Sequence, residues 1–206
     1  MRRGCFWLRR HRERFQARWL IAVLLGLRQG EVLRLTWRDV DLDPRVLAVR
    51  QTLQYRPGEG FHLVPPKTAR SRRIVPLPDA VVDALKLRRE QQETDRLAAG
   101  VEFWDDWGLV FTTRFGTPLS PRNDYRDFQR LVAAAGLRHV RLHDLRHTAA
   151  SLMLAQGVSP RVVMEILGHS QISVTMNTYS HVTPASSREA VAPVDGLLFE
   201  GRSELD

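Results

Sequence analysis

The sequence predicts a mainly α-helical protein with one small three-stranded antiparallel β-sheet, an α+β fold. Apolar residues recur with helical spacing in residues 11–36 and again through most of the chain after residue 78. Between these regions lie three short runs rich in β-branched residues, separated by turn residues. With 206 residues, 43% of them hydrophobic, the chain is long enough to bury a core as one compact domain.

The expected helices have recognisable ends. Residues 11–36 should form two helices that meet around Arg28, after a break near Gly26. A third helix should begin at Pro78 or Asp79 and end at Gly100. Two later helices share a serine N-cap, a proline at the first helical position and a terminal glycine: Ser120, Pro121 and Gly136 for one, and Ser159, Pro160 and Gly168 for the other.

The expected sheet comes from the runs "RVLAVRQTL", "FHLVPPKT" and "RRIVPLP". The stretch "YRPGEG", with Pro57, Gly58 and Gly60, provides the first turn. The second connection, through "ARS", places Lys67 at or beside a tight turn. We therefore expect Lys67 to lie on a hairpin between two strands.

The charge of the chain favours a polyanionic partner. Lysine and arginine total 31 against 23 acidic residues, a net charge of +8, and most of the excess is arginine, which grips phosphate with two hydrogen bonds. A basic, well-solvated surface would give the same composition, so charge alone leaves nucleic-acid binding open.

Cysteine content and hydropathy indicate a cytoplasmic protein. The single cysteine, Cys5, excludes an internal disulfide framework and a cysteine-rich zinc site. The apolar run from Trp19 to Leu27 is too short to span a bilayer, and no small-residue cleavage site follows it. We interpret this run as a buried helix and expect no membrane partner.

Helical packing does not explain six polar residues: Arg28, Lys67, His143, Arg146, His169 and Tyr179. Each has a simple structural alternative when taken alone. Arg28 could form a surface ion pair with Glu31 three residues later. A hairpin lysine aids solubility, and a helical tyrosine is usually a half-buried packing residue.

The stretch "LHDLRHTAASLML" combines polar and apolar helical faces. His143 and Arg146, at i and i+3, share a face and can point at one ligand, although a capping histidine with a snorkelling arginine is the alternative. His147 is expected to support the structure. The opposite face should pack into the core through Leu142, Leu145, Ala149 and Leu152.

A zinc site in this stretch is disfavoured. His143 and His147, at i and i+4, have a spacing that suits a helical metal site. The glutamate of an H-E-x-x-H motif is absent, however, and Arg146 would put a cation beside the metal.

Four motifs in order resemble the catalytic domain of the tyrosine recombinases, the phage integrase family. They are "GLRQGEVLRLTWRDVDLD", "PPKTARSRRIVPLP", "LHDLRHTAASLML" and "LGHSQISVTMNTYSHV". The resemblance implies a catalytic domain at residues 15–190, a basic extension at 1–14 and a tail at 191–206 that could be exchanged between protomers. It begins at residue 15, so we expect this chain to lack the family's N-terminal clamp domain, either as a fragment or as a naturally short form, and to be weakly active.

By this resemblance the catalytic residues are Arg28, Lys67, His143, Arg146, His169 and Tyr179, with Glu31 in support of Arg28. The two arginines would bind the nonbridging phosphate oxygens in the place of a metal, so we expect no cofactor. Tyr179 would be the nucleophile and Lys67 the general acid for the leaving oxygen. His143 would assist proton transfer at Tyr179, and His169 would donate a hydrogen bond to the phosphate.

The implied activity is site-specific DNA recombination through a 3′-phosphotyrosine, independent of ATP, by an integrase of a mobile genetic element. The implied partners are double-stranded DNA, a homotetramer on two DNA sites, and accessory or directionality proteins. Two alternatives remain open at this point. Residues 151–179 could form a helix-turn-helix of a non-catalytic DNA-binding regulator, and a relaxing type IB topoisomerase shares the chemistry.

Overall fold

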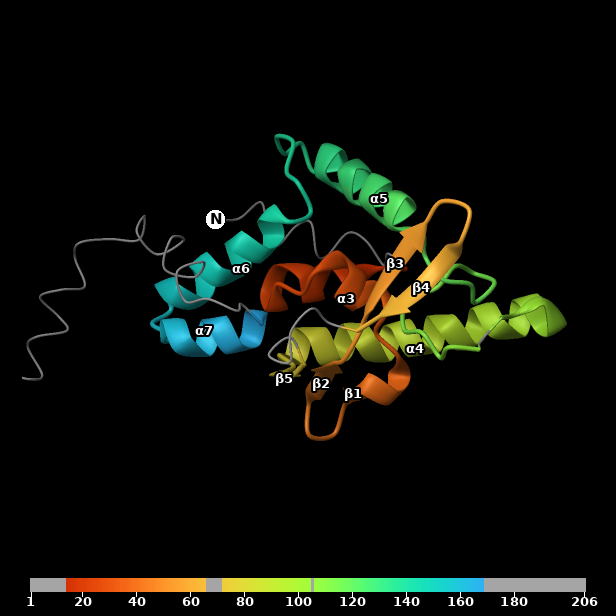
Figure 1. Ribbon diagram of the computed structural model, residues 1–206, viewed down its shortest axis with the longest axis horizontal. Helices are drawn as coiled ribbons and strands as arrows, with labels where there is room; N and C mark the ends of the chain where they lie inside the picture. Colours follow the sequence, from red (N-terminus) through yellow and green to blue (C-terminus); the bar gives the residue numbers. More distant parts are fainter. Residues whose placement is uncertain (1–13, 66–71, 105, 169–206) are drawn as a thin grey trace, which may run out of the picture.

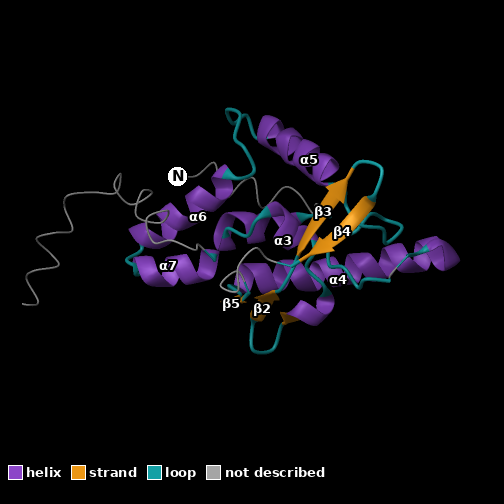
Figure 2. Cartoon of the chain, viewed as in Figure 1, coloured by secondary structure: helices purple, strands orange, loops and turns teal. Residues whose placement is uncertain are grey.

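The computed structural model describes residues 14–65, 72–104 and 106–168. Helices outweigh strands in this part of the chain, as Figure 2 shows, and the strands are antiparallel. The expected mainly α fold with a small antiparallel sheet is therefore confirmed. No helix in these ranges is long and apolar enough to cross a membrane.

The first helical region contains a break, as expected. Helix α2 (Gln16–Leu20) runs directly into a π-helical turn, η1 (Ile21–Leu25), which ends at Gly26 in the left-handed conformation with φ 61°. Helix α3 (Gln29–Leu33) then begins with Arg28 as its N-cap residue. Because glycine adopts positive φ without strain, Gly26 allows the chain to turn between the two helical segments.

The strands form two sheets, which differs from the expected single sheet of three runs. Their bounds are β1 (Val40–Asp41), which follows the 3-10 turn η2 (Trp37–Asp39), β2 (Val46–Val49), β3 (Thr52–Arg56), β4 (Gly60–Val64) and β5 (Arg73–Pro76). One sheet has the order β1-β2-β5, and β3 and β4 form a separate hairpin.

The first expected run is divided because its two halves have different partners. Its first half pairs with β5, from Val46 opposite Pro76 to Val49 opposite Arg73. Its second half pairs with β4 across the turn that contains Gly58 and Gly60, both at positive φ. The connection that carries Lys67 therefore joins a strand of the hairpin to a strand of the three-stranded sheet.

The later helices begin and end where the capping residues predict. Helix α4 (Asp79–Ala99) lies between Pro78 and Gly100 and is followed by the 3-10 turn η4 (Gly100–Glu102). The remaining helices are α5 (Pro121–Ala134), α6 (Asp144–Ala155) and α7 (Pro160–Leu167). Figure 1 shows α6 and α7 side by side at one end of the molecule, with α3 between them and the β3–β4 hairpin.

Helix α6 buries only part of the face that the sequence suggests. Ala149, Ala150 and Leu154 are buried, but Leu152 is 51% exposed, so the expectation that it packs into the core is wrong. The cause is that α6 packs between η1 and α7. Arg146 shares this buried face and is only 4% exposed.

A buried ion pair joins α5 to α2. The Arg18 guanidinium donates to both Asp124 carboxylate oxygens, at 3.0 and 2.9 Å, and both side chains are almost fully buried. The Gln29 amide also donates to Asp124, at 2.8 Å. Asp124 thus fixes the first residue of α3, directly after Arg28.

We expect Asp124→Asn to lower the free energy of unfolding by about 3–5 kcal/mol, because the buried Arg18 charge would lose its partner. Urea denaturation measures this loss. The control is Asp127→Asn on the same helix, where the carboxylate pairs with Arg130 in an exposed ion pair, so a loss below about 1 kcal/mol is expected. Equal losses in the two variants would contradict this role of Asp124.

Candidate active site

Arg28 projects from the N-terminus of α3 and is held by one carboxylate. Its backbone N–H donates to Glu31 Oε2 at 2.9 Å and its Nη1 donates to Glu31 Oε1 at 2.8 Å. Its Nη2 lies 3.4 Å from the carbonyl oxygen of Gly168, at the end of α7. The side chain is 43% exposed, so part of the guanidinium faces solvent. The simple ion pair expected from the i, i+3 spacing is present.

Arg146 is buried, and its guanidinium group donates to two backbone carbonyls. Nη1 donates to the carbonyl oxygen of Gly26 at 2.7 Å, and Nη2 donates to that of Leu167 at 2.5 Å. Burial, followed by the charge of Arg28, lowers the pKa of Arg146 to about 9, with Glu31 acting in the opposite direction. The side chain therefore remains a cation at neutral pH.

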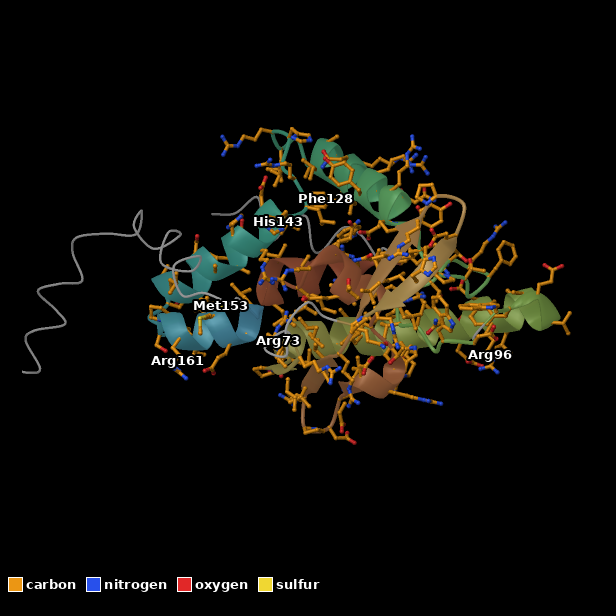
Figure 3. The ribbon with its side chains drawn as sticks, viewed as in Figure 1. Arg73, Arg96, Phe128, His143, Met153 and Arg161 are labelled. Atoms are coloured by element: carbon orange, nitrogen blue, oxygen red, sulfur yellow. The ribbon has the colours of Figure 1, made fainter. Side chains whose placement is uncertain are left out.

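Arg28, Arg146 and His143 line the same small pocket. Its volume is about 180 Å³, and its walls are Leu27, Arg28, Gln29, Leu142, His143 and Arg146. The expectation that His143 and Arg146 face one side of their helix is met, because both reach this pocket. Leu142 and Leu145, on either side of His143, pack against the cluster of Trp19 and Phe128. Figure 3 shows the His143 side chain at the start of α6.

His143 is exposed and lies against a second imidazole. The rings of His143 and His147 meet edge to face, with centroids 5.1 Å apart. Partial burial, then the charges of His147, Arg146 and Arg28, lower the pKa of His143 below its usual value of 6.5, while Asp144 acts to raise it. His143 is therefore neutral at neutral pH and able to accept a proton.

The structure adds Arg73, which the sequence did not single out. Its Nη2 and Nη1 donate to the two oxygens of Glu31 at 2.9 and 3.3 Å, and its Nε donates to the carbonyl oxygen of Ile166 at 2.6 Å. Glu31 thus bridges two arginines from different elements. The only local signal was a paired arginine at the start of the run "RRIVPLP", which by itself predicts a strand end.

Three arginines therefore surround one carboxylate. The charges of Arg28 and Arg73 act to lower the pKa of Arg146, and Glu31, the acidic residue among the three, acts to raise it. The excess of positive charge makes this a site for an anion with several oxygen acceptors. In the described ranges, no group of three His, Cys, Asp or Glu residues could hold a metal ion.

Arg73 also lines a larger basic groove. Its volume is about 710 Å³, and its lining includes five arginines together with Asp39: Arg34, Arg38, Arg50, Arg72 and Arg73. A charged cleft of this kind concentrates anionic ligands. Arg73 is the residue common to the groove and the Glu31 cluster.

Three of the expected catalytic residues lie outside the described residues. They are Lys67, His169 and Tyr179. Lys67 belongs to the segment between β4 and β5, and His169 directly follows Gly168 in sequence. Their places in the site stay predictions, whereas Arg28, Glu31, His143 and Arg146 are brought together.

Comparison with known proteins identifies the family. Residues 9–186 match the model of the phage integrase family. Because this match covers most of the chain, the protein belongs to that family, as the four motifs indicate.

Relatives and a solved structure agree with this assignment. The chain is 34% identical over 200 residues to a tyrosine recombinase XerC-like protein of Caldanaerobacter subterraneus subsp. tengcongensis, covering 90% of this chain and 50% of that protein. It is 31% identical over 235 residues to an integrase of Saccharopolyspora erythraea, covering 89% of this chain and 53% of the relative. It also resembles the Tn1549 transposon integrase in complex with transposon right end DNA, with a TM-score of 0.75 and 27% identity over 94% of this chain and 63% of that chain. The chain thus spans about half the length of these two curated relatives.

We expect Gly26→Ala to disturb the pocket, because the turn at Gly26 supports Arg146. A Cβ on Gly26 would lie 2.5 Å from Leu167 Cδ2 and 3.1 Å from Ala149 Cβ, at a φ of +61°. The left-handed conformation costs about 1–2 kcal/mol for alanine, and overpacking adds about 1–3 kcal/mol. Denaturant unfolding measures the sum.

The matched control is Gly136→Ala. Gly136 has a φ of +65°, and a Cβ there would meet nothing within 4 Å. Only the conformational cost is expected in this variant. If its free energy of unfolding fell as much as that of Gly26→Ala, α6 and α7 would not pack tightly on the turn at Gly26.

We expect the imidazole of His143 to titrate below 6.5 in the folded protein, and His147→Asn to raise its pKa by removing a nearby positive charge. A lowered histidine pKa means that the unfolded chain binds the proton more readily, so acidification through the ordinary value destabilises the fold. NMR titration of the histidine ring signals, assigned with His143→Asn, measures both values. A midpoint at or above the ordinary value would contradict the electrostatic picture of the pocket.

Proposed function

We propose that this chain is the catalytic part of a site-specific DNA recombinase that cuts and rejoins DNA strands through a 3′-phosphotyrosine. The observation that carries the proposal is the cluster of Arg28, Arg146 and His143 on one pocket, with more guanidinium than carboxylate charge around it. Membership of the phage integrase family supports the same activity.

The pocket suits a phosphodiester because its cations can neutralise charge on the nonbridging oxygens. The guanidinium group of Arg28 is the more accessible of the two, and that of Arg146 is a fixed, buried charge. The transition state of phosphoryl transfer gathers charge on these oxygens, so donors already in place lower the barrier. This role is the one that a divalent metal fills in other enzymes, so we propose that the reaction needs no metal.

The covalent step would use residues beyond the described ranges. The phenol oxygen of Tyr179 attacks the phosphorus and the bond to the 5′ oxygen breaks, which leaves a 3′-phosphotyrosine and a free 5′ hydroxyl. Lys67 gives the leaving oxygen its proton, neutral His143 assists removal of the Tyr179 proton, and His169 donates a hydrogen bond to the phosphate. The ester retains the energy of the broken bond, so resealing requires no ATP.

Double-stranded DNA is the proposed partner. The basic groove beside the pocket supports this, because guanidinium groups along a groove can follow the phosphates of a duplex. The Tn1549 transposon integrase, a structural neighbour, was solved with transposon end DNA. We further propose a homotetramer on two DNA sites, with accessory or directionality proteins, acting in the cytoplasm.

We propose a division of the chain into a catalytic domain at residues 15–190, a basic extension at 1–14 and an exchanged tail at 191–206. The contacts of α2 with α4 and of η1 with α6 support a catalytic unit that starts near residue 15. In the regulator alternative, α6 and α7 would act alone as a helix-turn-helix. That alternative gives no reason for Arg28, Arg73 and Arg146 to converge on the last turn of α7.

We expect the protein to form covalent adducts with DNA that depend on Tyr179. The test mixes the full chain with genomic DNA of the source organism in the presence of a chelator and without ATP. The mixture is then denatured, and the DNA that remains attached is sequenced. Adducts clustered at one sequence would establish the reaction, its independence of metal and its target together.

Two tyrosine variants complete this test. Tyr179→Phe should abolish the adducts, and Tyr55→Phe, which removes a tyrosine that is 50% exposed on the hairpin, should leave them intact. Adducts that persist in Tyr179→Phe would refute the assigned nucleophile. If the wild-type protein is folded but forms no adducts, the proposed activity of this chain is wrong.

A further inference from the structure

We propose that Arg73 is a positioning residue for cleavage, an inference that rests on the proposed function. It would set the direction of Arg28 through the shared carboxylate of Glu31 and fix the last turn of α7. Arg73 does not line the small pocket, so it would act on the phosphate through other residues.

The first contact is with Glu31. Each oxygen of this carboxylate accepts one hydrogen bond from Arg73 and one from Arg28, and the carboxylate is buried. A carboxylate held on one side by Arg73 presents a fixed pair of acceptors to Arg28 on the other. The side chain of Arg73 is only 6% exposed, so its geometry is set by packing as well as by charge.

The second contact is with the end of α7. The carbonyl oxygens of Ile166, Leu167 and Gly168 accept hydrogen bonds from Arg73, Arg146 and Arg28, respectively. Three consecutive carbonyls thus orient three guanidinium groups, and the negative end of the helix dipole favours the cations. Figure 3 shows Arg73 where the end of α7 meets β5.

Gly168 shows how closely Arg73 approaches this turn. A Cβ on Gly168 would lie 2.8 Å from Nη1 and 3.1 Å from Cζ of Arg73. Gly168 also has a φ of +68°, so glycine suits both the left-handed conformation and the contact. The next residue in sequence is His169, so Arg73 holds the point at which the chain continues toward two of the proposed catalytic residues.

Arg73 also keeps Glu31 charged. Burial would raise the pKa of Glu31, but the hydrogen bond and charge of Arg73, followed by those of Arg28, hold it below its ordinary value. The charged groups that face Glu31 are Arg28 on its own helix, Arg73 on β5 and Arg146 on α6. Without Arg73, we expect Glu31 to bind a proton at higher pH and to release Arg28.

The test compares single-turnover cleavage rates at saturating DNA, with a duplex that carries the sequence recovered from the covalent adducts. Arg73→Gln should slow cleavage by roughly 10- to 100-fold through misplacement of the phosphate-binding groups. DNA affinity should fall much less than the rate, because the Arg73 side chain is only 6% exposed and the other arginines of the basic groove remain. The fall of the rate on acidification should also begin at a higher pH in this variant, because Glu31 has lost the partner that keeps it ionised.

Arg73→Lys, which keeps the charge but cannot reach all three acceptors, should recover the pH profile and only part of the rate.

A double-mutant cycle separates positioning from general stability. If Arg73 acts through Glu31, the double variant with Arg73→Gln and Glu31→Gln will show a smaller fold-reduction of the cleavage rate than the product of the reductions in the two single variants. The charge control is Arg161→Gln, at the opposite end of α7, where the exposed arginine pairs with Glu165. It should cleave at the wild-type rate.

The remaining outcomes also decide the proposal. An unchanged rate in folded Arg73→Gln, or fully multiplicative losses, would overturn it; if Arg73→Gln does not fold, Arg73→Lys provides the same comparison. If the wild-type protein forms no adducts, the proposed function fails, and binding of inorganic phosphate, followed through the His143 ring signals, still tests Arg73. Weaker phosphate binding in Arg73→Gln than in Arg161→Gln would support positioning, and equal binding would overturn it.

Discussion

The pocket depends on the carboxylate of Glu31, which is the acidic member of a cluster of three arginines. Without it, Arg28, Arg73 and Arg146 would repel one another across a buried space, where like charges interact strongly. With it, two guanidinium groups are oriented and the surplus of positive charge remains for a ligand. Removal of a buried charge partner is far more damaging than loss of a surface pair, so the architecture tolerates little change at this position.

The fold brings this cluster together from four elements that are far apart in sequence. Arg28 starts α3, Arg73 starts β5, Arg146 lies in α6, and the carbonyls belong to α7. The turn at Gly26 precedes α3, and Asp124, which pairs with the buried Arg18, also accepts a hydrogen bond from Gln29 of α3. The helices and the small sheet therefore position charged groups that lie at or near their ends.

Local features of the sequence predicted much of this arrangement. Helix ends at Pro78, Ser159 and Gly168 follow from capping preferences, and the pairing of Arg28 with Glu31 follows from their spacing. Arg73 lies 42 positions from Glu31, and no local pattern encodes such a contact. The division of the first strand run and the exposure of Leu152 were missed for the same reason, because both depend on which distant element supplies the packing partner.

The two hydrogen bonds from Arg146 to backbone carbonyl oxygens also have an entropic consequence. An arginine side chain gives up about 2 kcal/mol of rotamer entropy when it is fixed. Arg146 loses this freedom on folding, because it donates hydrogen bonds to the carbonyl oxygens of Gly26 and Leu167. An anion that arrives in the pocket meets a donor that needs no further ordering, whereas Arg28, which is 43% exposed, still has freedom to lose.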